Sequence, residues 1–333
     1  MIKEALKKAV DRQSLTREEM QGVMEEIMTG NTTDAQIGAF LTALSMKGES
    51  VDEITGAAWV MRAKAAKIPL KNRDVVDTCG TGGDGAKTFN ISTAAAFAAA
   101  GAGVRVAKHG NRSVSSACGS ADVLKALGVN IELPPEKVGE CIDSIGIGFL
   151  FAPVFHSAMK YAIGPRREMG IRTIFNILGP LTNPAGAARQ VTGIFSPDLV
   201  VTIAEVLRHL GSLHVMVVHG DGLDEITPTG PTTVAELKDG KITSYKISPE
   251  DFGMARAKKE ELAGGDAGVN AGILRRIFEG EKGAKRDAVI LNAGAAIYVS
   301  GRTGSLKQGI EKAALSIDSG AAMEKLGQLA AFK

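Results

Sequence analysis

Residues 75–120 read VVDTCGTGGDGAKTFNISTAAAFAAAGAGVRVAKHGNRSVSSACGS, and this stretch decides the fold. Two short β-branched runs, at 75–77 and 104–106, each lead into a loop, and an alanine-rich run at 94–100 separates them. The succession of strand, loop, helix and strand is typical of an α/β unit with parallel strands. Both loops then lie at the carboxyl ends of their strands, where such folds bind ligands.

The first loop, at 80–85, contains four glycines in six residues. Glycine lets the backbone reach positive φ and lets a ligand approach the N–H groups without a Cβ in the way. Ser92 or Thr93 precedes the alanine-rich run and is the expected N-cap of a helix that begins beside this loop. A helix N-terminus next to a glycine loop favours an anionic ligand.

Gly80, Gly82 and Gly85 also match the dinucleotide fingerprint G-x-G-x-x-G, which is a weak signal alone. A dinucleotide site needs an Asp or Glu at the end of the next strand. Here that end carries Lys108 and Arg112, which suit phosphate oxygens better than a ribose diol. No P-loop motif occurs. The two loops therefore favour a phosphorylated sugar over a dinucleotide.

The composition fits an ordinary soluble globular protein of one large and one small domain, with 333 residues, 44% of them hydrophobic and 23% charged. A net charge of +2 argues against a nucleic-acid partner, and no apolar run is long enough to span a bilayer. The N-terminus does not read as a signal peptide, so we expect a cytoplasmic protein. Cys79, Cys118 and Cys141 lack the spacing of a disulfide framework or a zinc site and are expected to be small buried residues.

Residues 1–70 are predicted to be helical: a first helix at 1–10 is followed by capping boxes that begin at Thr16, Thr33 and Ser50. Ile37, Phe40, Leu41 and Leu44 form a stripe expected in a core or at a dimer face. After residue 69, short β-branched runs alternate with helices. The predicted strands lie at 75–77, 104–106, 129–131, 147–151, 191–195 and 215–218, with an antiparallel hairpin at 233–247 that turns at Asp239 and Gly240.

Four motifs in this order resemble anthranilate phosphoribosyltransferase over nearly the whole chain: GTGGDGAKTFNIST, KHGNRSVSS, RREMGIRTIFNILGPLTNP and GLDEIT. The resemblance implies an α/β fold with a small N-terminal helical domain at 1–70, joined by helical segments near 165–185 to a larger α/β domain at 73–333 with a mostly parallel sheet. It implies transfer of the 5-phosphoribosyl group of phosphoribosyl pyrophosphate to the amino group of anthranilate in tryptophan biosynthesis. It also implies a homodimer, and Mg²⁺ as cofactor, with two ions per site.

The resemblance also assigns site residues, motif by motif. Those for phosphoribosyl pyrophosphate are Gly80, Gly83, Asp84, Thr88, Asn90, Ile91, Ser92, Thr93, Lys108, Asn111, Arg112, Ser113, Val114, Ser115, Ser116 and Ser120. Those for anthranilate are Gly80, Asn111 and Arg166, with His109 nearby, and those for Mg²⁺ are Ser92, Asp224 and Glu225.

The chemistry of the residue types agrees with these assignments. A pyrophosphate leaving group needs its charge neutralised, and Mg²⁺ prefers one or two carboxylates plus substrate phosphates, which Asp224 and Glu225 would supply after the strand at 215–218. Arg166 suits an aromatic carboxylate. The apolar run 174–181 fits either a wall for the aromatic ring or plain core. His109 could accept the amine proton, but a substrate carboxylate or water could do so too, so the base stays open.

Two other functions remain as alternatives. A pyrimidine nucleoside phosphorylase also binds a ribose and a phosphate, although the second loop and the Asp224–Glu225 pair favour the transferase. A non-catalytic relative could bind nucleic acid through its basic clusters, against which stand the acidic pair and the low net charge.

Overall fold

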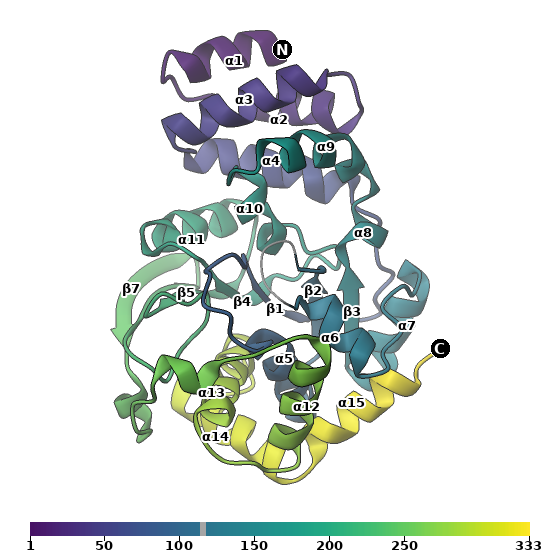
Figure 1. The fold of residues 1–333 in the computed structure, drawn as a ribbon, viewed down its shortest axis with the longest axis vertical. Helices are drawn as coiled ribbons and strands as arrows, with labels where there is room; N and C mark the ends of the chain where they lie inside the picture. Colours follow the sequence, from purple (N-terminus) through teal and green to yellow (C-terminus); the bar gives the residue numbers. More distant parts are fainter. Residues whose placement is uncertain (114–117) are drawn as a thin grey trace.

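The computed structural model describes residues 1–113 and 118–333, and its N-terminal part is a layer of helices at one end of the molecule (Figure 1). These are α1 (Ile2–Val10), α2 (Arg17–Met28), α3 (Asp34–Lys47) and α4 (Val51–Lys64). The predicted capping boxes at Thr16, Thr33 and Ser50 are all formed. The predicted starts of α2, α3 and α4 are thereby confirmed.

The apolar stripe of α3 is buried in the core of this layer, as its spacing predicts. A fifth helix, α9 (Lys160–Met169), returns from later in the chain and packs against α2 and α3. The helical layer therefore consists of α1–α4 together with α9, and the chain crosses between this layer and the rest of the molecule three times.

The α/β part is built on one sheet of seven strands. Their bounds are β1 (Val76–Gly80), β2 (Val106–Gly110), β3 (Ile147–Phe151), β4 (Arg189–Gly193), β5 (His214–Gly220), β6 (Thr232–Lys238) and β7 (Lys241–Ile247). Their order is β3-β2-β1-β4-β5-β6-β7; the first five are parallel, and β6 and β7 are antiparallel. The predicted fold class, a helical domain plus a mostly parallel α/β sheet, is confirmed.

The strand predictions differ in accuracy. The strand at 147–151 and the hairpin that turns at Asp239 and Gly240 are confirmed, and both turn residues adopt positive φ. β2 begins at Val106, later than predicted, because the Val104 N–H bonds back to the Ala99 carbonyl at the end of the preceding helix. The predicted strand at 129–131 is wrong: Val129 and Ile131 lie in the connection between α6 and α7 and are buried there, since hydrophobicity drives burial in any backbone conformation.

Alternate residues of the central strands face different cores. Met216 and Val218 of β5 belong to the core that α5 and α12–α15 share with one face of the sheet, whereas Val215 and Val217 pack with α11 and the helical layer. Figure 1 shows the sheet between the helical layer and the C-terminal helices. The remaining α-helices are α5 (Ile91–Gly101), α6 (Ser120–Ala126), α7 (Pro135–Ile145), α8 (Ala152–Phe155), α10 (Phe175–Leu178), α11 (Val200–His209), α12 (Ala267–Phe278), α13 (Ala284–Val299), α14 (Leu306–Asp318) and α15 (Ala321–Ala331).

Candidate active site

Strands β1, β2, β4 and β5 all end in glycine, and an acidic loop at 224–225 lies on three of these ends. A Cβ added to Gly193 would stand 1.5 Å from the Asp224 carbonyl oxygen. One added to Gly80 would stand 2.4 Å from Asp224 Oδ2, and one on Gly220 would stand 2.4 Å from the Glu225 carbonyl oxygen. Glycine at these ends lets the acidic loop rest directly on the sheet.

The glycine loop between β1 and α5 is held from its two sides. Thr81 N–H donates to the Gly193 carbonyl at 2.9 Å, and Phe195 N–H donates to Thr81 Oγ1 at 3.1 Å. Gly82 N–H donates to Asp224 Oδ2 at 2.7 Å. Gly82, Gly83 and Gly85 all have positive φ, which side chains rarely adopt. A backbone N–H of the glycine loop thus connects it to the acidic loop.

The N-terminus of α5 also lies beside the acidic loop. Its N-cap is Asn90, so the prediction of Ser92 or Thr93 as N-cap is wrong; the helix starts two residues earlier because Ile91 fills the core. Asn90 has no capping bond with its own helix. Its side chain instead bonds to the Cys118 carbonyl at 3.1 Å and to Asn270 Nδ2 at 2.9 Å, which ties α5 to the second loop and α12.

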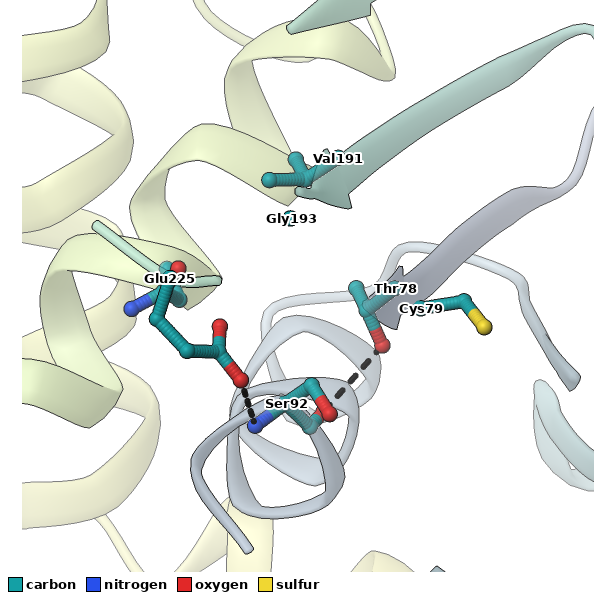
Figure 2. Close-up of a pocket in the computed structure, with 7 residues that line it drawn as sticks. Thr78, Cys79, Ser92, Val191, Gly193 and Glu225 are labelled. Carbon is teal, nitrogen blue, oxygen red and sulfur yellow. Dashed lines mark hydrogen bonds between the residues drawn. The ribbon is translucent and has the colours of Figure 1, made fainter. Parts of the chain in front are cut away.

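Glu225 Oε1 accepts the Ser92 N–H at 3.1 Å (Figure 2). One N–H of the first turn of α5 is therefore already bonded to a carboxyl group of the protein. Figure 2 also shows Thr78 facing Ser92, where its hydroxyl donates to the Ser92 carbonyl at 3.1 Å. A small cavity of about 10 Å³ lies among these residues and Asn292, with room for one water-sized group.

The acidic loop carries unusually concentrated charge. Burial, with Asp84 as the next cause, raises the pKa of Asp224, and burial together with the Asp224 charge raises the pKa of Glu225. Asp84 Oδ2 also lies 3.4 Å from the Asp224 N–H. A set of hard oxygen ligands whose charges repel each other is one that Mg²⁺ would stabilise, so these residues fit a divalent cation.

Lys108 lies beneath this group and is only 3% exposed. Its ammonium donates to the Thr78 carbonyl and lies 3.4 Å from Ser92 Oγ. Its charge lowers the pKa of Asp77 and Glu225 against the effect of burial. Lys108 therefore stabilises the acidic group at the base of the site, rather than extending freely from the strand end.

In the second loop, between β2 and α6, the described residues 111–113 contact the start of α6. Arg112 pairs with Asp122 at 3.2 Å and lies 5.6 Å from the Phe151 ring centroid, so its charge is partly engaged. The Asn111 carbonyl accepts from Ser120 Oγ at 3.2 Å, and Ser113 N–H donates to Asp122 Oδ2 at the same distance. The predicted ligands Val114, Ser115 and Ser116 lie outside the described residues. Thr88 lies farther along the first loop, where it bridges to Ala263.

His109 points to the opposite face of the sheet from Lys108. The backbone N–H of His109 donates to Asp77 Oδ1 at 3.0 Å, and the ring Nδ1 lies 3.1 Å from the Gly179 carbonyl oxygen. Burial lowers the pKa of His109 to about 3, and the ring lies 5.2 Å from that of His156. The Gly179 carbonyl can only accept, so Nδ1 carries the proton of the neutral ring and Nε2 is the atom that could take another; the low pKa makes that protonation unfavourable.

Within the described residues, potential ligand atoms of Asp77, Cys79 and His109 all lie within 4.8 Å of one another, and none of these three is a predicted Mg²⁺ ligand. The mixture of oxygen, nitrogen and sulfur is unsuited to Mg²⁺. Burial also raises the pKa of the Cys79 thiol, which keeps it protonated and a weak ligand. This group is therefore part of a buried polar layer, not the predicted metal site.

Arg166, on α9, lies with its guanidinium carbon 5.0 Å from the Phe175 ring centroid, and burial lowers its pKa. Ile174, Leu178 and Leu181 of the apolar run are buried in the core of the helical layer, which favours the plain-core alternative for them. Cys118 and Cys141 are buried, as predicted, and Cys79 is half-buried.

Two residues near the site were not among the predicted site residues. Asn292 accepts the Ile226 N–H at 3.0 Å and donates to the Ile226 carbonyl at 2.7 Å, so it braces the acidic loop from α13. A single amide in the apolar run VILNAGAAIYV is a signal that could have indicated this role. The other residue, Arg172, contacts the glycine loop, and no local pattern distinguishes it from a surface arginine.

Comparison with known proteins gives one consistent family. Residues 72–323 match the α/β domain of a glycosyl transferase family, and residues 3–65 match its helical bundle domain. The chain is 58% identical to the anthranilate phosphoribosyltransferase of Alkaliphilus metalliredigens, covering 99% of this chain and 97% of that one. It is 56% identical to that of Acetivibrio thermocellus, covering 100% and 96%.

Solved structures agree. The anthranilate phosphoribosyltransferase from Thermus thermophilus superposes with a TM-score of 0.94 at 47% identity, covering 98% of both chains. The Saccharomyces cerevisiae enzyme in complex with PRPP (phosphoribosyl pyrophosphate) and Mg superposes with a TM-score of 0.89 at 27% identity, covering 98% of this chain and 96% of that one. The same yeast enzyme with 4-fluoroanthranilate gives 0.87 at 27% identity, covering 99% and 96%.

Proposed function

The chain belongs to the anthranilate phosphoribosyltransferases, and we propose that its glycine loop, α5 N-terminus and acidic loop form the active site of that reaction. The reaction transfers the 5-phosphoribosyl group of phosphoribosyl pyrophosphate to the amino nitrogen of anthranilate and releases pyrophosphate, a step of tryptophan biosynthesis. The observation that carries the proposal is the bond from Ser92 N–H to Glu225, because it brings a helix N-terminus and a buried carboxylate pair to one glycine loop.

Phosphoribosyl pyrophosphate would bind across the two loops. Backbone N–H groups of Gly83 and of the first turn of α5 suit its phosphate oxygens, and Lys108 adds a buried positive charge behind Ser92. The full set proposed for this substrate is Gly80, Gly83, Asp84, Thr88, Asn90, Ile91, Ser92, Thr93, Lys108, Asn111, Arg112, Ser113, Val114, Ser115, Ser116 and Ser120.

Mg²⁺ is the cofactor of this family, and a relative is solved with PRPP and Mg bound. We propose that Ser92, Asp224 and Glu225 hold it, with two ions per site. When bound, the ion would neutralise negative charge on the pyrophosphate leaving group. The chain's own part is to hold both carboxyl groups in place; burial raises their pKa values, and the nearby Lys108 charge opposes part of that rise for Glu225.

During transfer, the bond between ribose C1 and the pyrophosphate oxygen breaks, and its electron pair leaves with pyrophosphate. The amine nitrogen forms the new bond to C1 and then loses a proton. Positioning and electrostatics are the expected contributions of the protein, without a covalent enzyme intermediate. His109 is buried and neutral, and we assign it no proton transfer.

Anthranilate is proposed to contact Gly80, Asn111 and Arg166. Support comes from the burial that lowers the pKa of Arg166 and from its stacking on Phe175, since a partly desolvated guanidinium binds a carboxylate more strongly than an exposed one.

The experiment mixes the protein with phosphoribosyl pyrophosphate, Mg²⁺ and anthranilate and follows the loss of the free aryl amine. Consumption that requires all three additions supports the proposal, and absence of turnover overturns it. Phosphorolysis of thymidine without Mg²⁺ would favour a nucleoside phosphorylase, and salt-dependent binding of single-stranded DNA would favour a nucleic-acid-binding relative.

We also propose a homodimer and the division into a helical domain at 1–70 and an α/β domain at 73–333. Trp59 and Val201 are 55% and 46% exposed on α4 and α11, which contact one another, and exposed apolar groups of this kind support a partner surface.

No helix in the described ranges is both long and apolar enough to cross a membrane. A cytoplasmic location is proposed on the biosynthetic reaction alone.

A further inference from the structure

Arg172 lies in the short connection between α9 and α10, on the side of the helical layer. Its backbone is anchored there, because Ser45 Oγ of α3 donates to the Arg172 carbonyl at 3.3 Å. The next residue is fixed as well, since Thr173 N–H donates to Asn176 Oδ1 at 3.0 Å. The position from which the Arg172 side chain starts is therefore set by α3 and α10.

The side chain crosses from this anchor to the glycine loop. Arg172 Nη2 donates to the Gly83 carbonyl, and the guanidinium carbon lies 4.4 Å from the Phe195 ring centroid. The Phe195 N–H in turn bonds to Thr81 Oγ1 at 3.1 Å. One guanidinium thus holds the loop twice, directly at Gly83 and through Phe195 at Thr81.

Two glycines of the loop have open space around their α-carbons. A Cβ added to Gly82 or Gly85 would meet no atom within 4 Å, so these residues face open space. On the opposite side the loop is bonded to the acidic loop, through Gly82 N–H and Asp224. A glycine-rich segment loses much conformational entropy when it is fixed, so the Arg172 bond at Gly83 adds to the order that the Thr81 and Gly82 bonds provide.

We propose that Arg172 is a positioning residue: it ties the glycine loop to the helical layer and thereby sets the affinity for the pyrophosphate-bearing substrate. The inference rests on the proposed function for the identity of that substrate. Arg172 acts through Gly83 and Phe195 and does not contact the reacting atoms.

The test compares Arg172→Ala with Arg167→Ala, an exposed arginine on α9 that makes none of these contacts, and with Arg172→Lys. In Arg172→Ala the Kd for phosphoribosyl pyrophosphate with Mg²⁺ should rise about tenfold, the loss of a charge-assisted contact. KM for anthranilate and kcat at saturating donor should change less than about threefold. Arg172→Lys should recover part of the affinity, because it keeps the charge but not the planar stacking. Arg167→Ala should match wild type.

A second measurement does not depend on the reaction. Hydrogen exchange of the amides at 80–86, without any substrate, should be faster in Arg172→Ala and unchanged in Arg167→Ala. If the wild type lacks turnover but the loop still exchanges faster in Arg172→Ala, the proposed function fails while the link between Arg172 and the loop stands.

Phe195→Leu separates positioning from direct binding. Because it removes the stacking partner, it should weaken donor binding as well, and the double variant should lose less than the sum of the two single losses. Unchanged exchange at 80–86 in Arg172→Ala would overturn the proposal. So would a Phe195→Leu variant with normal donor affinity, since Arg172 would then bind the substrate itself. Equal losses for both substrates with a lowered Tm would show a merely structural role.

Discussion

Lys108 is a buried cation whose nearest partners are backbone and hydroxyl oxygens, with Asp77 and Glu225 close enough to feel its charge. Lys108→Met keeps most of the volume and removes the charge. We expect the Kd for phosphoribosyl pyrophosphate to rise at least tenfold, since charge-assisted contacts contribute about 1.5–3 kcal/mol. Calorimetric titration of the donor with Mg²⁺ measures this. An unchanged Kd at physiological salt would remove Lys108 from the donor site.

Arg166 should act on the other substrate. Arg166→Ala removes the guanidinium stacked on Phe175, and KM for anthranilate should rise at least tenfold while the Kd of phosphoribosyl pyrophosphate stays near wild type. Steady-state kinetics at saturating donor checks this, with Arg167→Ala as the matched control. If both substrates weaken equally, the role of Arg166 is structural or it binds phosphate.

The carboxylates of the acidic loop make a third residue-scale prediction. Asp224→Asn with Glu225→Gln keeps the shape and removes two carboxyl groups whose burial raises their pKa values, so folding should survive. Turnover should fall or demand at least tenfold more Mg²⁺, because the metal loses two charged ligands. A Mg²⁺ titration of turnover, together with calorimetric Mg²⁺ binding, tests this. Identical titration curves for wild type and variant would show that these carboxylates do not hold the metal.

Sequence alone predicted the residue types of the site better than their partners. The strand-end position of Asp224 and Glu225 was predictable, because a β-branched run and two glycines precede them. The pairing of Arg112 with Asp122 and the burial of Lys108 were not, since both depend on tertiary packing that no local pattern encodes. Arg172 was missed for the same reason: its contact joins segments that are far apart in the chain.

At the scale of elements, β5 and β6 are joined by a polar cluster at the base of the sheet. Glu236 accepts from His214 at 2.8 Å and from the Tyr245 hydroxyl at 2.7 Å. Burial would raise the pKa of Glu236, but these hydrogen bonds outweigh it and lower the pKa to about 2. Because the pKa in the folded state is depressed, the stabilisation is complete above the unfolded-state pKa and is lost as the pH falls toward 2.

Glu236→Gln should therefore cost roughly 2 kcal/mol of unfolding free energy at pH 7, after allowance for partial exposure of the group. The cost should be smaller at pH 3, where the wild-type carboxylate has already lost part of its advantage. Urea unfolding of both proteins at the two pH values measures it. Glu250→Gln, whose partner Arg256 is exposed, is the control and should cost little at either pH. An equal cost for Glu236→Gln at both values would contradict the assigned pKa.

Elements with a local chemical signal were predicted well. The capping boxes of α2, α3 and α4 and the Asp239–Gly240 turn depend on side chains within a few residues, and all four are present. The N-cap of α5 and the strand at 129–131 were wrong, because there packing decides. Asn90 begins α5 without a capping bond to it, and Val129 is buried without belonging to a strand.

At the scale of the whole molecule, the helical and α/β parts share a core although the sequence divides near residue 70. Met24 and Phe40 of the helical layer belong to the same apolar cluster as Val217 of β5 and Leu237 of β6. Arg62 of α4 donates to the Leu181 carbonyl at 2.6 Å and to the Leu210 carbonyl at 3.3 Å, and burial lowers its pKa to about 10. Composition along the chain indicates where domains divide, but not whether their cores are continuous.

This continuity predicts that both parts unfold together. Trp59, the one tryptophan of the chain, lies on α4 and reports on the helical layer, whereas far-UV circular dichroism reports on all helices and strands. In urea, the two signals should give one transition with the same midpoint, since a layer that shares its core with the sheet cannot lose its packing alone. Arg62→Met leaves the two carbonyls unpaired and should separate the midpoints, with tryptophan fluorescence changing first. If the wild-type signals already separate, the helical layer is an independent folding unit and the shared core does not couple it to the sheet.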